Sequence, residues 1–67
     1  MRALKIYTFR DNVFKKTPVI INIDCISQIR PSTSNGNKFY EILFGTNSVN
    51  VAPEDMQPIW DAIGMRL

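Results

Sequence analysis

The sequence predicts a small α+β fold, in which an antiparallel meander of four to five strands is followed by one C-terminal helix packed on one face. Two patterns predict it. Short stretches rich in β-branched and aromatic residues alternate with turn-forming residues over residues 3–52. A stripe of apolar residues at helical spacing follows only near the end of the chain. The chain has 67 residues, which is the length of a single small domain, 1–67.

The first strand is expected at about residues 3–10. Leu4 and Ile6 alternate with Lys5 and Tyr7, so that apolar side chains fall on both faces of the strand. Such a strand needs cover on both sides. Sequential short strands joined by tight turns favour a meander, whose second face one helix cannot cover.

The second strand is expected at about residues 19–30. It begins with the β-branched run Val19–Ile23 and ends before Pro31. The polar residues near Asp24 predict a bend or bulge, which makes five strands if it divides the element. We expect the Asp24 side chain to hold this bend through a local hydrogen bond, and Cys25 to be a small buried apolar residue.

Two further strands are expected at about 38–44 and 48–52. Asn35-Gly36 lies before the first of them and is a dipeptide typical of tight hairpins, because both residues tolerate positive φ. Gly45 begins a second tight connection. Within the later strand, Val49 and Val51 alternate with polar residues, which predicts one buried and one exposed face.

The helix is expected at about residues 55–64. Apolar residues from Met56 to Ile63 follow one another at i, i+3, i+4 and i+7, including Trp60. An interior proline would break a helix, so Asp55 is expected to be the N-cap, which places Pro58 in the first turn. Gly64 is expected to end the helix.

Charge is divided unequally along the chain. Residues 1–40 have seven basic and two acidic side chains, whereas residues 41–67 have one basic and four acidic side chains, and the formal net charge is +2. This distribution invites anions or acidic surfaces at one end of the molecule and favours contact between copies. With no histidine and one cysteine, the sequence argues against triad catalysis, zinc and disulfides. We therefore expect no catalytic residue, cofactor or metal, and a cytoplasmic protein without a membrane segment.

The candidate binding residues are basic side chains that could hold an anion and aromatic side chains that could stack on a ligand. A hairpin loop of hydroxyls, amides and backbone N–H groups between two cations could hold phosphate, although it could also be an ordinary solvated hairpin. Aromatic residues interleaved with basic ones could stack on bases or simply pack. The predicted set is Lys15, Lys16, Arg30, Lys38, Tyr7, Phe9 and Tyr40.

Two segments resemble those of short bacterial and phage accessory proteins, of which the flagellar FlbD-type small proteins are one example. They are VIINIDCISQI at residues 19–29 and FYEILFGTNSVNVAPED at residues 39–55. The resemblance covers residues 19–63 and consists mainly of hydrophobic spacing. It implies a small accessory protein of the phage type and brings no catalytic residues with it.

Together these observations predict a non-enzymatic, self-associating binding protein. It would act as an inhibitor that sequesters a small anionic, nucleotide-like ligand or blocks a host protein. Two alternatives remain open, namely a single-stranded nucleic-acid-binding module, disfavoured by the modest charge, and a structural subunit of a larger assembly.

Overall fold

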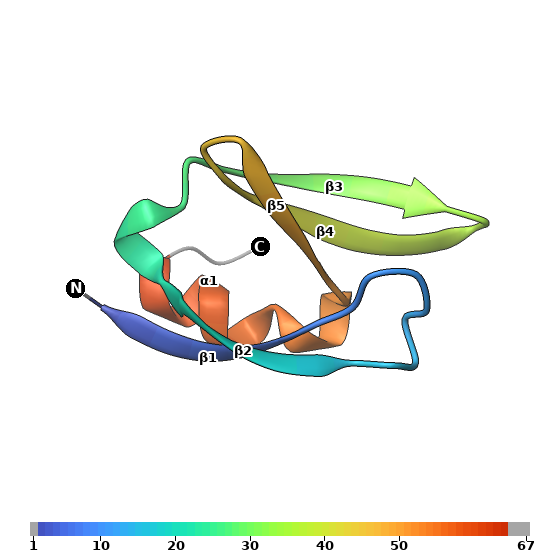
Figure 1. The fold of residues 1–67 in the computed structure, drawn as a ribbon, viewed down its shortest axis with the longest axis horizontal. Helices are drawn as coiled ribbons and strands as arrows, with labels where there is room; N and C mark the ends of the chain where they lie inside the picture. Colours follow the sequence, from blue (N-terminus) through green and yellow to red (C-terminus); the bar gives the residue numbers. More distant parts are fainter. Residues whose placement is uncertain (1, 65–67) are drawn as a thin grey trace.

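The computed structural model describes residues 2–64, which form five strands, two 3-10 turns and one α-helix (Figure 1). In chain order the elements are β1 (Ala3–Thr8), β2 (Thr17–Asn22), η1 (Ile23–Cys25), β3 (Gln28–Ser34), β4 (Asn37–Phe44), β5 (Asn47–Val51), η2 (Pro53–Asp55) and α1 (Gln57–Ile63). The expected α+β class, with antiparallel strands and one C-terminal helix packed against them, is confirmed.

Within residues 2–64 the strands form two antiparallel sheets that are joined by one isolated backbone bridge. β1 pairs with β2 in one sheet, and the order in the other is β3-β4-β5. One bridge joins the sheets, in which Phe9 N donates to Asn50 O at 3.0 Å. In Figure 1 the β1–β2 hairpin and the three-stranded sheet lie on opposite sides of the molecule, and α1 lies alongside β1.

The element expected over residues 19–30 is two strands separated by the 3-10 turn η1. Asn22 starts this turn, because its Oδ1 accepts a hydrogen bond from Asp24 N at 3.0 Å. The side chain that holds the bend is therefore Asn22, and the expectation for Asp24 was wrong. The turn buries Ile23 and leaves Cys25 exposed, so the expected burial of this cysteine was also wrong.

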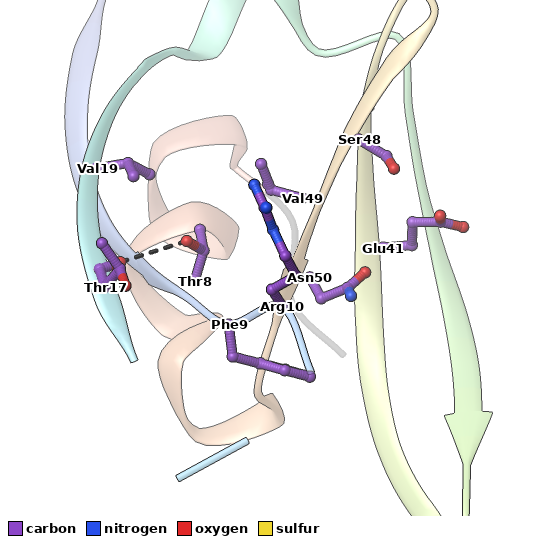
Figure 2. Close-up of a pocket in the computed structure, with 9 residues that line it drawn as sticks. All are labelled: Thr8, Phe9, Arg10, Thr17, Val19, Glu41, Ser48, Val49 and Asn50. Atoms are coloured by element: carbon purple, nitrogen blue, oxygen red, sulfur yellow. Dashed lines mark hydrogen bonds between the residues drawn. The ribbon is translucent and has the colours of Figure 1, made fainter. Parts of the chain in front are cut away.

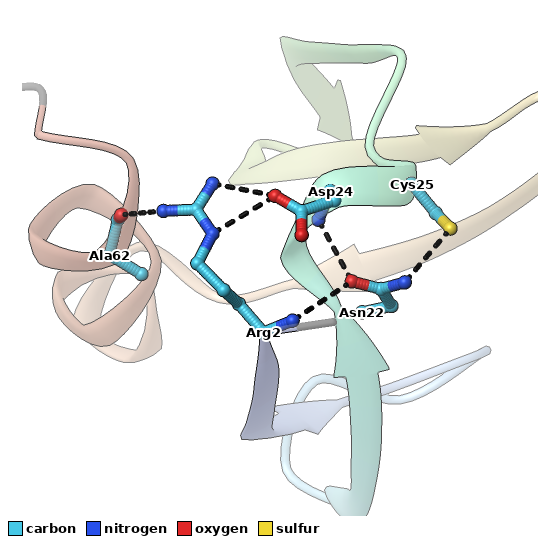
Figure 3. A network of polar contacts seen from close by, with 5 residues as sticks. All are labelled: Arg2, Asn22, Asp24, Cys25 and Ala62. Atoms are coloured by element: carbon cyan, nitrogen blue, oxygen red, sulfur yellow. Dashed lines mark hydrogen bonds and ion pairs between the residues drawn. The ribbon is translucent and has the colours of Figure 1, made fainter.

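Arg2 ties η1 to the end of α1 (Figure 3). Its guanidinium donates to Asp24 Oδ1 from Nε at 2.9 Å and from Nη2 at 2.8 Å. Its Nη1 donates to Ala62 O at 3.2 Å, which satisfies one of the free carbonyls at the helix end. Both charged side chains are about half exposed, so the ion pair itself contributes little to stability.

The core lies where both sheets meet the helix. Its side chains come from β1, β2, η1, β4, β5 and the helical segment, and each is at most 9% exposed: Ile6, Ile21, Ile23, Ile42, Val51, Met56 and Ile59. Every strand but β3 contributes a buried apolar residue. The predicted apolar stripe of the helix faces this core, with Trp60 and Ile63 packed at its margin.

The helix begins one residue later than its expected cap. Met56 is the N-cap, and its side chain makes no capping hydrogen bond. Asp55, the expected cap, belongs to η2 instead, and its carboxylate lies 2.8 Å from the ammonium of Lys16. Pro58 still lies in the first turn, where no backbone donor is needed. Gly64 ends the helix with φ of 77°, as expected, since a left-handed residue there is strained for other side chains.

The open edge of β2 has a proline whose missing N–H faces solvent. Ile23 N donates to Arg2 O, so the backbone N–H and C=O groups of Ile23 face the β1 side of the strand. Because successive residues of a strand direct these groups to alternate sides, Val19 and Ile21 also face β1, whereas Pro18 and Ile20 face the open edge.

The open edge of β3 has the same feature. Asn50 O faces β1, so its register partner Glu41 directs its backbone groups toward Arg30 of β3. The next residue along, Pro31, therefore faces outward. Each open edge thus lacks one donor, which is a common protection against uncontrolled strand pairing.

Candidate ligand-binding cleft

A cleft opens where β1 and β5 separate. Phe9 makes the last contact with β5, and the chain then bends away at Arg10 into the loop that leads to β2. An Asx turn holds this loop, since Asn12 Oδ1 accepts from Phe14 N at 2.9 Å and Asn12 O accepts from Lys15 N at 2.9 Å. Near Ser48, β5 is paired with β4, and the departure of the chain leaves the opposite side of β5 without a neighbouring strand.

We name this space the Arg10 cleft. Its volume is about 460 Å³, which is within the usual range for small-molecule sites. Figure 2 shows the β1–β2 residues on one side, those of β4 and β5 on the other, and the Arg10 side chain extended between them next to Val49. The lining residues are Thr8, Phe9, Arg10, Thr17, Val19, Glu41, Ser48, Val49 and Asn50.

The floor of the cleft is held by local contacts. Thr8 is nearly buried, and its hydroxyl donates to Thr17 O at 3.3 Å (Figure 2). This bond leaves the oxygen of the Thr8 hydroxyl free to accept another. Hydroxyl and amide groups therefore line a concave space from both sheets, which is the arrangement that orients a polar ligand.

A smaller recess adjoins the cleft at the β3–β4 hairpin, and we call it the hairpin recess. It measures about 130 Å³ and shares Phe9, Arg10 and Asn50 with the cleft. The Phe9 ring meets the Phe39 ring edge to face, with ring centres 5.5 Å apart. The hairpin contributes Ser34, Asn35, Asn37, Lys38 and Phe39 to this recess.

The charges around the two spaces favour an anion. Among residues 2–64, neither Arg10 nor Lys38 forms an ion pair. Two acids are present, Asp11 in the recess and Glu41 in the cleft. Glu41 is neutralised by Arg30, whose Nε lies 2.7 Å from its Oε1. Within residues 2–64, two unpaired cations, Arg10 and Lys38, therefore face one unpaired acid, Asp11, and the balance favours an anionic ligand.

The structure gathers only two of the seven predicted residues at this site, Phe9 and Lys38. Two of the others are engaged in ion pairs, Arg30 with Glu41 and Lys16 with Glu54 and Asp55. The contacts of its ammonium with the carboxylates of Asp55 and then Glu54 raise the pKa of Lys16 above its usual value.

The remaining three predicted residues lie elsewhere. Tyr40 packs edge to face on Trp60 with ring centres 5.4 Å apart. Tyr7 lies on the outer face of the β1–β2 hairpin with Lys5 Nζ 5.5 Å from its ring centre. Lys15 is exposed in the loop. The binding role of all seven residues stays a prediction.

Arg10 is the residue that the predicted set missed. The alternation of basic and aromatic residues up to Arg10 was the available signal. What decides its importance is that the chain contacts β5 at Phe9 just before it bends away, and no local pattern in the sequence indicates that β5 is the neighbour there.

A second, more apolar groove of about 530 Å³ lies between η1, β3 and the end of α1. Ile26, Ile29, Tyr40, Trp60 and Ile63 are among its lining residues. Arg2 lies at the same groove but is already bound to Asp24 and Ala62. Among residues 2–64, this groove therefore has no charged side chain left to orient a ligand.

No protein-family model, curated protein or solved structure matches this chain. The resemblance to FlbD-type accessory proteins thus stays a prediction. No helix within residues 2–64 has the length and apolar character needed to cross a membrane. Over the same residues, no three histidine, cysteine or acidic side chains gather in a way that could hold a metal ion.

Proposed function

We propose that this chain is a non-enzymatic binding protein that self-associates and holds a small phosphate-bearing anion in the Arg10 cleft. One observation carries the ligand proposal. Arg10 and Lys38 are cations without ion-pair partners among residues 2–64; Arg10 lines both the cleft and the adjoining hairpin recess, and Lys38 lines the recess beside the Phe9–Phe39 pair. An arginine can hold a phosphate through two parallel hydrogen bonds.

The rest of the cleft suits a nucleotide-like molecule. A phosphate at Arg10 would leave the body of the ligand among Thr17, Ser48 and Val49, which offer both polar and apolar contact. The Phe9 and Phe39 rings supply a surface on which a base could stack. Inhibition would then consist of withholding this ligand or blocking a protein that uses it. The exposed free Cys25 is compatible with a reducing, cytoplasmic setting.

Self-association is supported by the exposed side of the β1–β2 hairpin. Ile20 is 75% exposed and Tyr7 is 43% exposed on the same outer face. A chain this short buries little of its apolar surface on its own, so a second copy is a natural source of cover.

The ligand proposal is tested by titrating AMP into the protein and following binding by calorimetry and by amide NMR shifts. We expect Arg10→Gln and Lys38→Gln each to weaken AMP binding by about tenfold or more, because each removes a charge-assisted hydrogen bond. Lys15→Gln is the matched control, since it removes the same charge from an exposed loop position outside both concave spaces.

Two comparisons make the test decisive. Adenosine, which lacks the phosphate, should bind far more weakly than AMP. Equal losses in all three variants would indicate nonspecific charge attraction and contradict the site. A short single-stranded oligonucleotide that binds more tightly than AMP, with an affinity that falls steeply with salt, would support the nucleic-acid alternative instead.

A further inference from the structure

We infer that two copies of this chain pair through the open edges of their β2 strands, antiparallel and centred on Ile20. The inference rests on the self-association proposed above and names the surface and its geometry. The resulting sheet would have the strand order β1-β2-β2-β1, with the second half supplied by the partner copy.

The β2 edge has the composition of a pairing strand. The segment Thr17–Asn22 contains no charged residue, so that Pro18 is its one protective feature, whereas protected edge strands often also carry lysine or another charge. The other open edge, β3, is mostly polar and contains Arg30. Among residues 2–64, β2 is paired only with β1, so its second side is available to another strand.

The backbone groups on this edge complement themselves about a two-fold axis. Ile20 directs both N–H and C=O outward, so two Ile20 residues can exchange hydrogen bonds. Asn22 N–H of each copy then lies opposite Pro18 O of the other. The exception is Asn22 O in each copy, because Pro18 of the other copy has no N–H to donate to it. This carbonyl is not left without a partner, since as the N-cap of η1 it already accepts the first hydrogen bond of that turn. A two-fold axis at Ile20 thus satisfies most of the edge with groups the chain itself provides.

Charge selects the antiparallel direction. The β2 strand is preceded by Lys15-Lys16 and followed by Asp24. Lys16 is held by Glu54 and Asp55, and Asp24 by Arg2, so among residues 2–64 Lys15 is the unpaired charge at the ends of this strand. Parallel pairing would place the two Lys15 side chains together, whereas antiparallel pairing separates them. On the outer face, the two Lys5 side chains would be three strand spacings apart, about 14 Å, which exceeds the screening length of about 8 Å at physiological salt.

Pairing would also cover the exposed apolar surface. Ile20 lies opposite Lys5 within the hairpin. Of the large apolar side chains in β1 and β2, it is the most exposed. A shallow apolar hollow lies beside it, formed by Lys5, Pro18, Val19 and Ile20. In the paired sheet the two Ile20 side chains would be adjacent on this face, which removes apolar area from water in both copies.

The experiment is sedimentation velocity of the full chain over a wide concentration range, under reducing conditions so that Cys25 cannot cross-link copies. We expect a reversible dimer with twice the mass of one chain. Ile20→Lys should weaken it by about tenfold or more, because it opposes two like charges at the axis and removes apolar contact. Pro18→Val should tighten it, because it restores the donor that faces Asn22 O.

Thr33→Lys is the matched control, because it adds the same charge to the other edge strand. It should leave the dimer unchanged. Hydrogen exchange offers a direct readout, since the Ile20 and Asn22 amides should gain protection only at concentrations where the dimer forms. Circular dichroism spectra that match the wild type ensure that a weakened dimer does not reflect unfolding.

The outcomes separate the two proposals. A wild-type chain that stays monomeric at every concentration contradicts both the self-association and the β2 pairing. A wild-type dimer that is indifferent to both Ile20→Lys and Pro18→Val contradicts only the β2 pairing and moves the contact to another surface. Equal weakening by Ile20→Lys and Thr33→Lys would likewise overturn it, because net charge alone would then explain the effect.

Discussion

At the scale of single residues, Lys16 is the charged side chain among residues 2–64 that contacts two carboxylates at once. Its ammonium lies 3.1 Å from Glu54 Oε1 and 2.8 Å from Asp55 Oδ2. Asp55 Oδ2 is buried. It lies within ion-pair distance of Lys16 Nζ, but the two groups are not oriented for a hydrogen bond. Lys16 therefore fastens the β1–β2 loop to η2 through an oxygen that has no other protein partner within the described part of the chain.

This contact predicts how stability depends on pH. The pKa of Lys16 is raised by Asp55 and then Glu54, so its contribution is complete below the ordinary value of 10.5 and is lost as pH rises through the raised value. The pKa of Glu54 is lowered by its own backbone N–H and then by Lys16. Its contribution is present above 4.5 and is lost as pH falls through the lowered value. We expect Tm to decline in both of these pH ranges.

The variant Lys16→Met separates the two arms of that profile. It should lower Tm at neutral pH, because Asp55 Oδ2 loses its one cation, and it should flatten the decline on the alkaline side. Lys15→Met removes the same charge from the adjacent exposed position and serves as the control. Thermal melts over the pH range measure both. An alkaline arm that persists unchanged in Lys16→Met would show that another group causes it.

Lys16 also illustrates why binding residues were hard to predict. The sequence shows a basic pair, Lys15-Lys16, and nothing nearby to neutralise it. The carboxylate that Lys16 contacts at Glu54 is 38 positions away, so its proximity follows from the fold and not from spacing. Arg30 is a similar case, because its partner Glu41 lies across a hairpin whose register the sequence does not determine.

At the scale of elements, α1 depends on the core for its existence. Seven residues are too few for a helix to be stable alone in water, so packing has to supply its stability. Ile59 and Met56 are fully buried beneath the sheets, whereas Asp61 on the same helix is exposed and only receives a hydrogen bond from Gln57 at 2.9 Å.

We therefore expect Ile59→Ala to lower the free energy of unfolding by about 2–5 kcal/mol, a large part of the total of about 3–10 kcal/mol expected for a domain of this size. Asp61→Ala should change it by about 0.5 kcal/mol or less. Urea denaturation followed by tryptophan fluorescence measures both. If Ile59→Ala is unfolded from the outset, Ile59→Val gives the graded loss. Equal effects of Ile59→Ala and Asp61→Ala would contradict the packing described for α1.

The elements that were predictable are those whose signal is local. Asn35 and Gly36 both adopt positive φ, 51° and 79°, as the hairpin dipeptide indicated. The helical stripe and Gly64 were likewise visible in the sequence. The 3-10 turn at Ile23–Cys25 was not, because its apolar residue continues the pattern of β2 and the decisive contact is made by the Asn22 side chain.

At the scale of the whole molecule, the ligand cleft and the pairing edge belong to opposite faces of one hairpin. Thr17 and Val19 direct their side chains into the cleft, whereas Ile20 points to the outer face. The sequence indicated apolar side chains on both faces of β1. It did not indicate that the strands would divide into two sheets, since that division depends on η1 and on the single Phe9–Asn50 bridge.

This arrangement predicts that binding and assembly are separable. Ile20→Lys, which should yield a monomer, is expected to retain AMP affinity within about twofold, because no cleft residue is altered. Calorimetry on wild type and variant at equal concentration measures it. A loss of AMP binding together with the dimer would instead place the ligand between copies.

Pro18 and Pro31 together limit how far strand addition could proceed. An amyloid fibril requires every backbone group to meet a partner above and below, without interruption, along the fibril axis. The open edges of β2 and β3 each lack one backbone N–H donor, at Pro18 and Pro31, so a strand added at either edge would leave one hydrogen bond unmade. The β2 edge can thus pair with a second copy at high concentration while the protein still resists conversion into fibrils.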